Sequence, residues 1–227
     1  LDLVSTPINY ISYKVASLDK KQHDVQIYFE AAPQLTVDVD RQPVKFDKLT
    51  KNGFTYVKTG TIDQPVLDRK GDDLRIDWGY LYFGGKLSEK ENLAVADYFD
   101  AKKSFTQNGV LPADVNPKSF SKNMKEKMTV LAYSNSLGAV SKEPVSGYLM
   151  VGYDDVYAIE YMYQQLMAYW KHDGKVDIYQ AFEKGQKTYG SLMTSCEEFD
   201  KTMLKEAEAA GGKQYAELCA MAYRQAI

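Results

Sequence analysis

Residues 74–85 read LRIDWGYLYFGG, and this stretch decides how the rest of the chain is interpreted. If it is a β-strand, Trp78 and Tyr80 share one face, while Asp77 and Phe83 share the other. Both faces are largely apolar, which is typical of a strand inside a sandwich. Alternatively, the aromatic row is a platform on which a ligand stacks. The stretch predicts a sheet and leaves both roles open.

Other short segments also show the period-two pattern of strands. The clearest is DVQIYFE, residues 24–30, in which Val25, Ile27 and Phe29 alternate with polar or amphipathic residues. Weaker candidates are residues 8–15, 35–39, 54–58, 129–133 and 145–151. The last two could pair as one long hairpin. The first two thirds of the chain are therefore expected to be mainly β.

Residues 86–128 have a different character. Residues 87–105 carry charges around a modest apolar spacing, which fits a short helix or an irregular edge. Residues 110–128 contain two prolines and many lysines. This second segment is expected to be an exposed loop.

The apolar spacing changes from Asp154 onward. Apolar residues now recur at steps of three and four, the spacing of an amphipathic helix: Val156, Ile159, Tyr163, Leu166 and Trp170. Asp154 and Asp155 stand where carboxylates would cap the first turn of this helix. Gly174 is expected to end it in a left-handed conformation.

Two further helices are expected after this point. Asp177 caps the first of them, whose apolar rhythm continues to Ala207 before Gly211 and Gly212 stop it. The last begins near Tyr215. The fold class is therefore α+β: a partial antiparallel β-sandwich over residues 1–152, followed by helices over residues 153–227.

Composition limits the function classes. The chain has 227 residues, 44% of them hydrophobic and 26% charged, as in ordinary globular proteins. Its net charge of −3 lacks the positive excess typical of proteins that bind nucleic acid, so no nucleic-acid partner is expected. No apolar run is long enough to span a membrane. The absence of an initiating Met suggests a segment of a longer protein.

The sequence contains none of the common catalytic or cofactor motifs, such as GxSxG, HExxH, a P-loop or GxGxxG. Only two histidines are present, and no CxxC pair suggests zinc, so neither a metal nor a cofactor is expected. Cys196 and Cys219 lie on apolar helix faces, where buried free thiols are common. A disulfide between them is the alternative.

Five residues are candidates for a ligand site or a domain interface: Asp77, Trp78, Tyr80, Asp154 and Asp155. Asp77 is a carboxylate among apolar neighbours and needs a partner, for which Arg75, two residues back on the same strand face, is expected. A structural ion pair or a hydrogen bond to a neighbouring loop is favoured over catalysis there. Trp78 and Tyr80 either pack between layers or stack on a ligand.

Several long segments, in the same order, resemble the glutaminase A-like family of microbial proteins. They are LDLVSTPINYISYKV (1–15), HDVQIYFE (23–30), GTIDQPVL (60–67), GDDLRIDWGYLYF (71–83), LAYSNSLGAV (131–140), GYDDVYAIEYM (152–162) and the segment from CEEFDK to the C-terminal YRQA (196–226). The resemblance covers most of the chain and is weakest between residues 86 and 127.

This resemblance implies a β-supersandwich region followed by the first helices of a six-hairpin α/α toroid. It implies hydrolysis of the glutamine side-chain amide to glutamate and ammonia by the full-length protein, with an extracytoplasmic location, periplasmic or secreted. The chain alone is expected to be inactive. The substrate of the full-length protein would then be a small-molecule amide. The alternative is a glycan-binding or structural β-sandwich of a glycoside-hydrolase-like protein, whose substrate would be a glycan. An incomplete helical face would favour self-association.

Overall fold

The computed structural model describes residues 1–115 and 128–226. The chain divides into two compact units, Leu1–Glu183 and the residues from Lys184 onward. The exposed loop expected over residues 110–128 falls largely outside the described residues. No helix in the part of the chain that the structure describes has the length and apolar character needed to cross a membrane.

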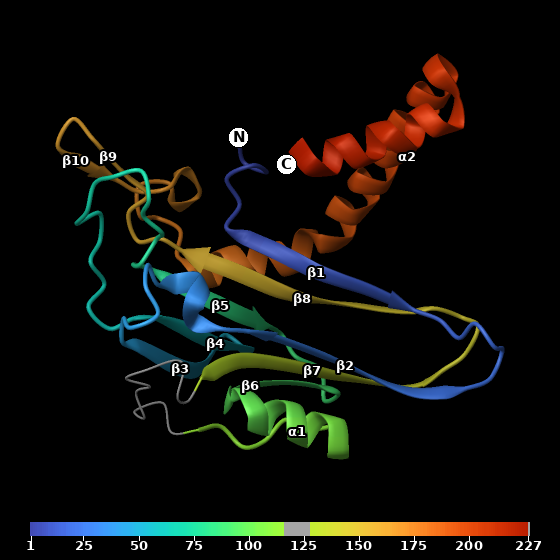
Figure 1. Ribbon diagram of the computed structural model, residues 1–227, viewed down its shortest axis with the longest axis horizontal. Helices are drawn as coiled ribbons and strands as arrows, with labels where there is room; N and C mark the ends of the chain where they lie inside the picture. Colours follow the sequence, from blue (N-terminus) through green and yellow to red (C-terminus); the bar gives the residue numbers. More distant parts are fainter. Residues whose placement is uncertain (116–127, 227) are drawn as a thin grey trace. The chain divides into compact units, whose positions relative to one another are not determined.

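The first unit contains a large antiparallel sheet (Figure 1). Its strands, in spatial order, are β1 (Ile8–Val15), β8 (Val145–Asp154), β5 (Tyr80–Gly85), β4 (Phe54–Thr61) and β3 (Val44–Lys51). Strand β5, from the stretch LRIDWGYLYFGG, is thus the central strand, with β4 and β8 hydrogen-bonded to its two edges.

A smaller antiparallel sheet faces the large one (Figure 1). Its spatial order is β2 (His23–Ala31), β7 (Thr129–Val140) and β6 (Glu91–Asp97). The core between the two sheets contains Phe83 and Leu81 from β5 and Leu93 and Leu131 from the smaller sheet. Burial of these apolar side chains is the main force that holds the layers together. The expected α+β class with a β-sandwich part is confirmed.

The outer face of the large sheet is also covered within the first unit. Tyr56 and Tyr82 point outward from β4 and β5 and pack against Phe182, near the start of helix α2 (Ile178–Ala226). Phe182 is fully buried. This second apolar layer explains why β5 is apolar on both faces: each face packs against a different partner.

The outer face of the smaller sheet packs against helix α1 (Tyr98–Asn108). Asp97 begins this helix, because its carboxylate accepts hydrogen bonds from the backbone N–H groups of Phe99 and Asp100. Gly109 ends it in the left-handed conformation. The short helix expected within residues 87–105 is present from Tyr98 onward, whereas the regular strand β6 stands where an irregular edge was the alternative.

Three strand expectations need correction. Residues 35–39 are not a strand: the 3₁₀ helix η1 (Pro33–Thr36) occupies the first of them, with the Thr36 hydroxyl donating to the Pro33 carbonyl at 2.8 Å. Strands β7 and β8 do not form a hairpin pair, because each finds its partners in a different sheet. The strand expected across residues 74–83 begins only at Tyr80.

The amphipathic helix expected from Asp154 is also wrong. Strand β8 runs to Asp154, and a small hairpin follows, made of β9 (Ile159–Tyr161) and β10 (Gln164–Leu166) (Figure 1). Met162 and Tyr163 join these strands with φ angles of 48° and 65°, the left-handed geometry of a tight hairpin turn. The spacing of three and four residues arises from two short strands and a turn.

The short 3₁₀ helix η2 (Tyr169–Lys171) and the left-handed Gly174 then lead into α2. Asp177 caps α2 as expected, accepting a hydrogen bond from the Gln180 backbone N–H at 2.8 Å.

The second unit is the remainder of α2, which is two helical segments joined at Gly212. Gly212 has φ 79° and ψ 179°, so the expected break near Gly211 and Gly212 is confirmed. The segments fold back on each other, with the rings of Phe199 and Tyr223 at 5.2 Å. Cys196, one turn before Phe199 in the first of these segments, is exposed.

Cys219 is partly exposed, and both cysteines are free. The expectation of buried thiols is therefore wrong, and so is the alternative of a disulfide between Cys196 and Cys219.

Candidate functional site

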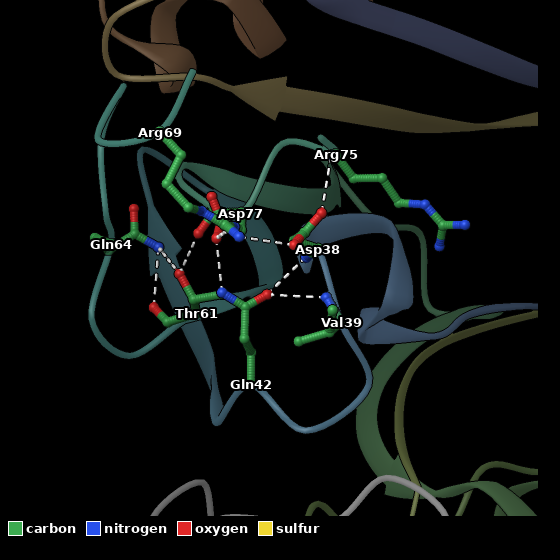
Figure 2. Close-up of polar contacts among 8 residues, drawn as sticks. All are labelled: Asp38, Val39, Gln42, Thr61, Gln64, Arg69, Arg75 and Asp77. Carbon is green, nitrogen blue, oxygen red and sulfur yellow. Dashed lines mark hydrogen bonds and ion pairs between the residues drawn. The ribbon is translucent and has the colours of Figure 1, made fainter. Parts of the chain in front are cut away.

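Asp77 lies in the irregular segment just before β5, and only 3% of its surface is exposed. Its Oδ2 accepts a hydrogen bond from Nε2 of Gln42 at 2.7 Å and forms an ion pair with the guanidinium of Arg69 (Figure 2). Burying a carboxylate is costly unless it is paired and hydrogen-bonded. Asp77 meets this requirement entirely with groups of its own chain.

The partner of Asp77 is Arg69, and the expected pair with Arg75 is wrong. Arg75 contributes its backbone N–H, which donates to Oδ1 of Asp38 at 3.1 Å, while its side chain points away from Asp77 (Figure 2). The reason is that residues 74–79 are not a strand, so residues two apart do not share a face.

Arg69 connects two carboxylates. Its Nη1 lies 2.8 Å from Oδ2 of Asp38, in addition to the pair with Asp77. The backbone N–H of Arg75, followed by the Arg69 guanidinium, lowers the pKa of the Asp38 carboxyl below its ordinary value. The two aspartates therefore hold Arg69 between them as a bridge (Figure 2).

Gln42 orders the loop on the other side of Asp77. Its Oε1 accepts the backbone N–H groups of Asp38 at 2.6 Å and Val39 at 3.2 Å, while its Nε2 donates to Asp77. One side chain thus joins the loop after η1 to the segment before β5 (Figure 2).

Two side chains from the end of β4 and the loop after it hold the backbone of residues 77–79. The Thr61 hydroxyl donates to the Asp77 carbonyl at 2.5 Å. The Gln64 amide accepts from the Gly79 N–H at 2.7 Å and donates to the Gly79 carbonyl at 3.0 Å. These contacts satisfy backbone groups that no strand partner reaches.

Trp78 connects the same turn to the end of β8. Its Nε1–H donates to the Tyr157 carbonyl at 3.0 Å, and its own carbonyl accepts from the Tyr153 hydroxyl at 2.5 Å. Burial raises the pKa of Tyr153, so this hydroxyl stays protonated and can donate. The side chain of Trp78 is half-buried, and its polar end is already occupied.

Asp154 ends β8 and does not cap a helix, contrary to expectation. Its Oδ1 lies 2.5 Å from Nζ of Lys171, which is 8% exposed, and also accepts the Val156 N–H at 3.0 Å. Lys171 donates in addition to the Val156 carbonyl at 3.0 Å. Asp154 thereby anchors the segment that returns from the β9–β10 hairpin.

Asp155 differs from its neighbour, and it too lies outside any helix. Its Oδ1 is buried and has no hydrogen-bond partner. Burial raises the pKa of the Asp155 carboxyl, and the charge of Asp154 adds to this, while Lys171 opposes it. Among the candidate residues, Asp155 alone combines an unpaired buried oxygen with a carboxyl that resists ionisation.

Tyr80 opens β5 and lies opposite Asp154 in the strand register, but its ring belongs to a different surface. It is half-buried on the outer face of the large sheet, next to Lys45 and Lys58. These two ammonium groups lie 5.2 Å and 4.8 Å from its ring centroid. The two tyrosines of β5 therefore differ in burial: Tyr82 is buried against α2, whereas Tyr80 is partly exposed.

The structure brings Asp77, Trp78, Asp154 and Asp155 to the same end of β5 and β8, with the Trp78–Tyr153 hydrogen bond between them. Sequence reasoning missed four residues of this end, Asp38, Gln42, Arg69 and Lys171. Lys171 stands directly beside Trp170 in an apolar segment, a position that could have indicated a buried lysine with a charge partner. The other three lie in loops, where spacing gives no indication of contact.

The chemistry available at this end of the sheet is limited. Asp77 is enclosed and occupied, so it lacks the access that a general acid or base needs. Within residues 1–115 and 128–226, no group of three or more His, Cys, Asp or Glu side chains is arranged to hold a metal ion. The arrangement is suited to fixing the entry of β5 against β8.

A comparison with protein families gives a match over residues 1–206. The chain belongs to the family described as Domain of unknown function (DUF5127). The DUF5127 match includes the whole first unit and the earlier part of the second. No curated protein matches the chain.

Proposed function

We propose that this DUF5127 chain is a structural β-sandwich portion of a glutaminase A-like protein located outside the cytoplasm. The support is the collinear resemblance of its long segments to that family, whose activity is hydrolysis of glutamine to glutamate and ammonia. In this proposal the sandwich supports the hydrolytic part of the full-length protein, and the chain alone does not hydrolyse glutamine.

The observation that carries the structural role is the environment of Asp77. This carboxylate is 3% exposed, and its partners are Arg69 and Gln42. A catalytic carboxylate must reach a substrate proton or carbon, directly or through one water. Asp77 instead joins three loops, so its loss is expected to weaken the fold and to leave the chemistry of correctly folded molecules unchanged.

The test is ammonia release from glutamine by the full-length protein, measured for wild type and for Asp77→Asn. We expect release by both proteins, with equal kcat per folded molecule and a lower melting temperature for the variant. No release from glutamine by wild type would contradict the glutaminase proposal. Loss of kcat in a variant that melts like wild type would contradict the structural role.

A second candidate function is glycan binding, and the partly open ring of Tyr80 favours it. Aromatic rings on a sandwich surface can stack on sugar rings, while their hydroxyls remain available for hydrogen bonds. Binding of the chain to a panel of glycans, run beside the ammonia assay, separates the two candidates. Glycan binding or cleavage without ammonia release would favour the second.

A further inference from the structure

A small pocket lies on the outer face of the large sheet, over β3, β4 and the first residue of β5. Its volume is about 180 Å³, and it is lined by Lys45, Phe46, Asp47, Lys58 and Tyr80. The residues that hold Asp77 and Asp154 do not line it. The pocket is below the roughly 300–1,000 Å³ typical of sites for drug-sized ligands, so it suits a smaller molecule.

The Tyr80 ring forms one wall of this pocket, and one edge of the ring lies against the backbone of β4. A Cβ atom at Gly60 would come within 2.7 Å of Cδ1 of Tyr80, so only glycine leaves room for the ring there. A ring held in this way loses little conformational freedom when a ligand binds.

The charged side chains around the ring carry a net positive charge. Lys45 and Lys58 both place Nζ near the Tyr80 ring, at 5.2 Å and 4.8 Å from its centroid. The one carboxylate of the pocket, Asp47, lies 3.9 Å from Lys58 Nζ, which is longer than a hydrogen bond. The Lys58 side chain is only 21% exposed, so its charge is partly removed from water. An anion would compensate this charge better than a neutral group would.

We propose that this pocket binds a small carboxylate that also carries a hydrogen-bond donor, the chemistry shared by amino acids and acidic sugars. Lys45 and Lys58 bind the carboxylate, and the Tyr80 ring packs against the adjoining carbon skeleton. Asp47 accepts a hydrogen bond from an ammonium or hydroxyl group of the ligand. Asp47 also disfavours a multiply charged anion without donors, such as phosphate. The proposal does not depend on the glutaminase activity.

The test is titration calorimetry of the chain with D-glucuronate, D-glucose, L-glutamate and inorganic phosphate. We expect glucuronate or glutamate to bind, glucose to bind at least about tenfold more weakly, and added salt to weaken binding because the contacts are ionic. Binding of glucuronate alone identifies an acidic sugar as the ligand class, and binding of glutamate alone identifies an amino acid. Equal binding of glucose and glucuronate, binding of phosphate alone, or no binding of any probe would overturn the proposal.

Variants localise the binding. Lys45→Gln combined with Lys58→Gln is expected to weaken it at least about tenfold, the effect of losing charge-assisted contacts. Lys14→Gln is the matched control, since Lys14 is an exposed lysine on β1, at the opposite edge of the same sheet. Equal binding by the double variant and the Lys14 variant would overturn the assignment to this pocket. Backbone NMR shifts of the wild-type protein, expected to be largest in β3 and β4, test the location without any substitution.

Discussion

The α-carbon of Gly79 faces the backbone carbonyl of Asp154 so closely that a Cβ atom at residue 79 would lie 2.2 Å from that oxygen. Gly79 also has φ +81°, a conformation that residues with a Cβ rarely adopt. The closeness results from the register that places Tyr80 opposite Asp154. The entry of β5 is thus in direct backbone contact with the end of β8.

Gly79→Ala is therefore expected to lower the free energy of unfolding by more than the strain of its left-handed backbone conformation alone. Gly53 offers a matched control, because it has φ +77° and no atom within 4 Å of the Cβ position. Gly53→Ala should lower the free energy of unfolding by about 1 kcal/mol, the strain of the left-handed conformation. Gly79→Ala should lower it by about 2–4 kcal/mol, since a backbone clash is added. Urea unfolding of both variants measures this difference, and equal losses would refute the close approach.

Trp78 is expected to contribute through packing and through one hydrogen bond. Trp78→Phe keeps an aromatic ring but removes the Nε1–H that donates to the Tyr157 carbonyl, together with part of the indole, and should cost about 1–2 kcal/mol. Trp78→Ala also removes the ring and should cost about 2–3 kcal/mol, somewhat less than for a fully buried aromatic residue. Thermal unfolding compares the two. A Trp78→Ala variant that melts like wild type but fails to bind a ligand would show that the ring is a binding platform instead.

Asp38 and Asp155 should give opposite pH dependences. The pKa of Asp38 is lowered from 3.8, so its stabilising contribution is present above that value and is lost as the pH falls through the folded-state pKa. The pKa of Asp155 is raised from 3.8, so folding is penalised once the pH rises above that value and fully above the folded-state pKa.

The corresponding variants separate these effects in urea unfolding between about pH 3 and about pH 7. Asp38→Asn should be less stable than wild type at the higher pH and approach it at the lower pH. Relative to wild type, Asp155→Asn should gain stability as the pH rises. If the stability of the Asp155 variant relative to wild type fell with rising pH, the carboxylate of Asp155 would have to be paired in the folded protein.

The parts of the fold that the sequence predicted are those where one strong local pattern decides the structure. Residues 8–15 are a strand with the expected bounds, and residues 24–30 lie within β2. The cap at Asp177 and the break at Gly212 depend on residue types with specific backbone preferences, and both are present. Local chemistry was sufficient in these places.

The errors arise where tertiary contacts override the local pattern. The spacing after Asp154 fits a helix, but Met162 and Tyr163 adopt left-handed conformations that no propensity indicates. Asp77 was recognised as a carboxylate that needs a partner, yet the partner is Arg69, because residue 77 lies in an irregular segment before β5 and not in the strand. The need for a charge partner could be predicted from the sequence, whereas its identity depends on how the loops fold.

The most direct test of the account is the thermal unfolding of Asp77→Ala compared with Arg75→Ala. The central claim is that the Asp77 carboxylate joins the loops of Gln42 and Arg69, whereas the Arg75 side chain points away from Asp77. Loss of the Asp77 carboxylate leaves the Gln42 amide without its acceptor and should cost about 1–3 kcal/mol. At about 2–4 °C per kcal/mol for a protein of this size, we therefore expect the melting temperature to fall by about 2–12 °C for Asp77→Ala and to stay unchanged for Arg75→Ala. An Asp77→Ala variant that melts like wild type, or an Arg75→Ala variant that loses as much as Asp77→Ala, would contradict the account.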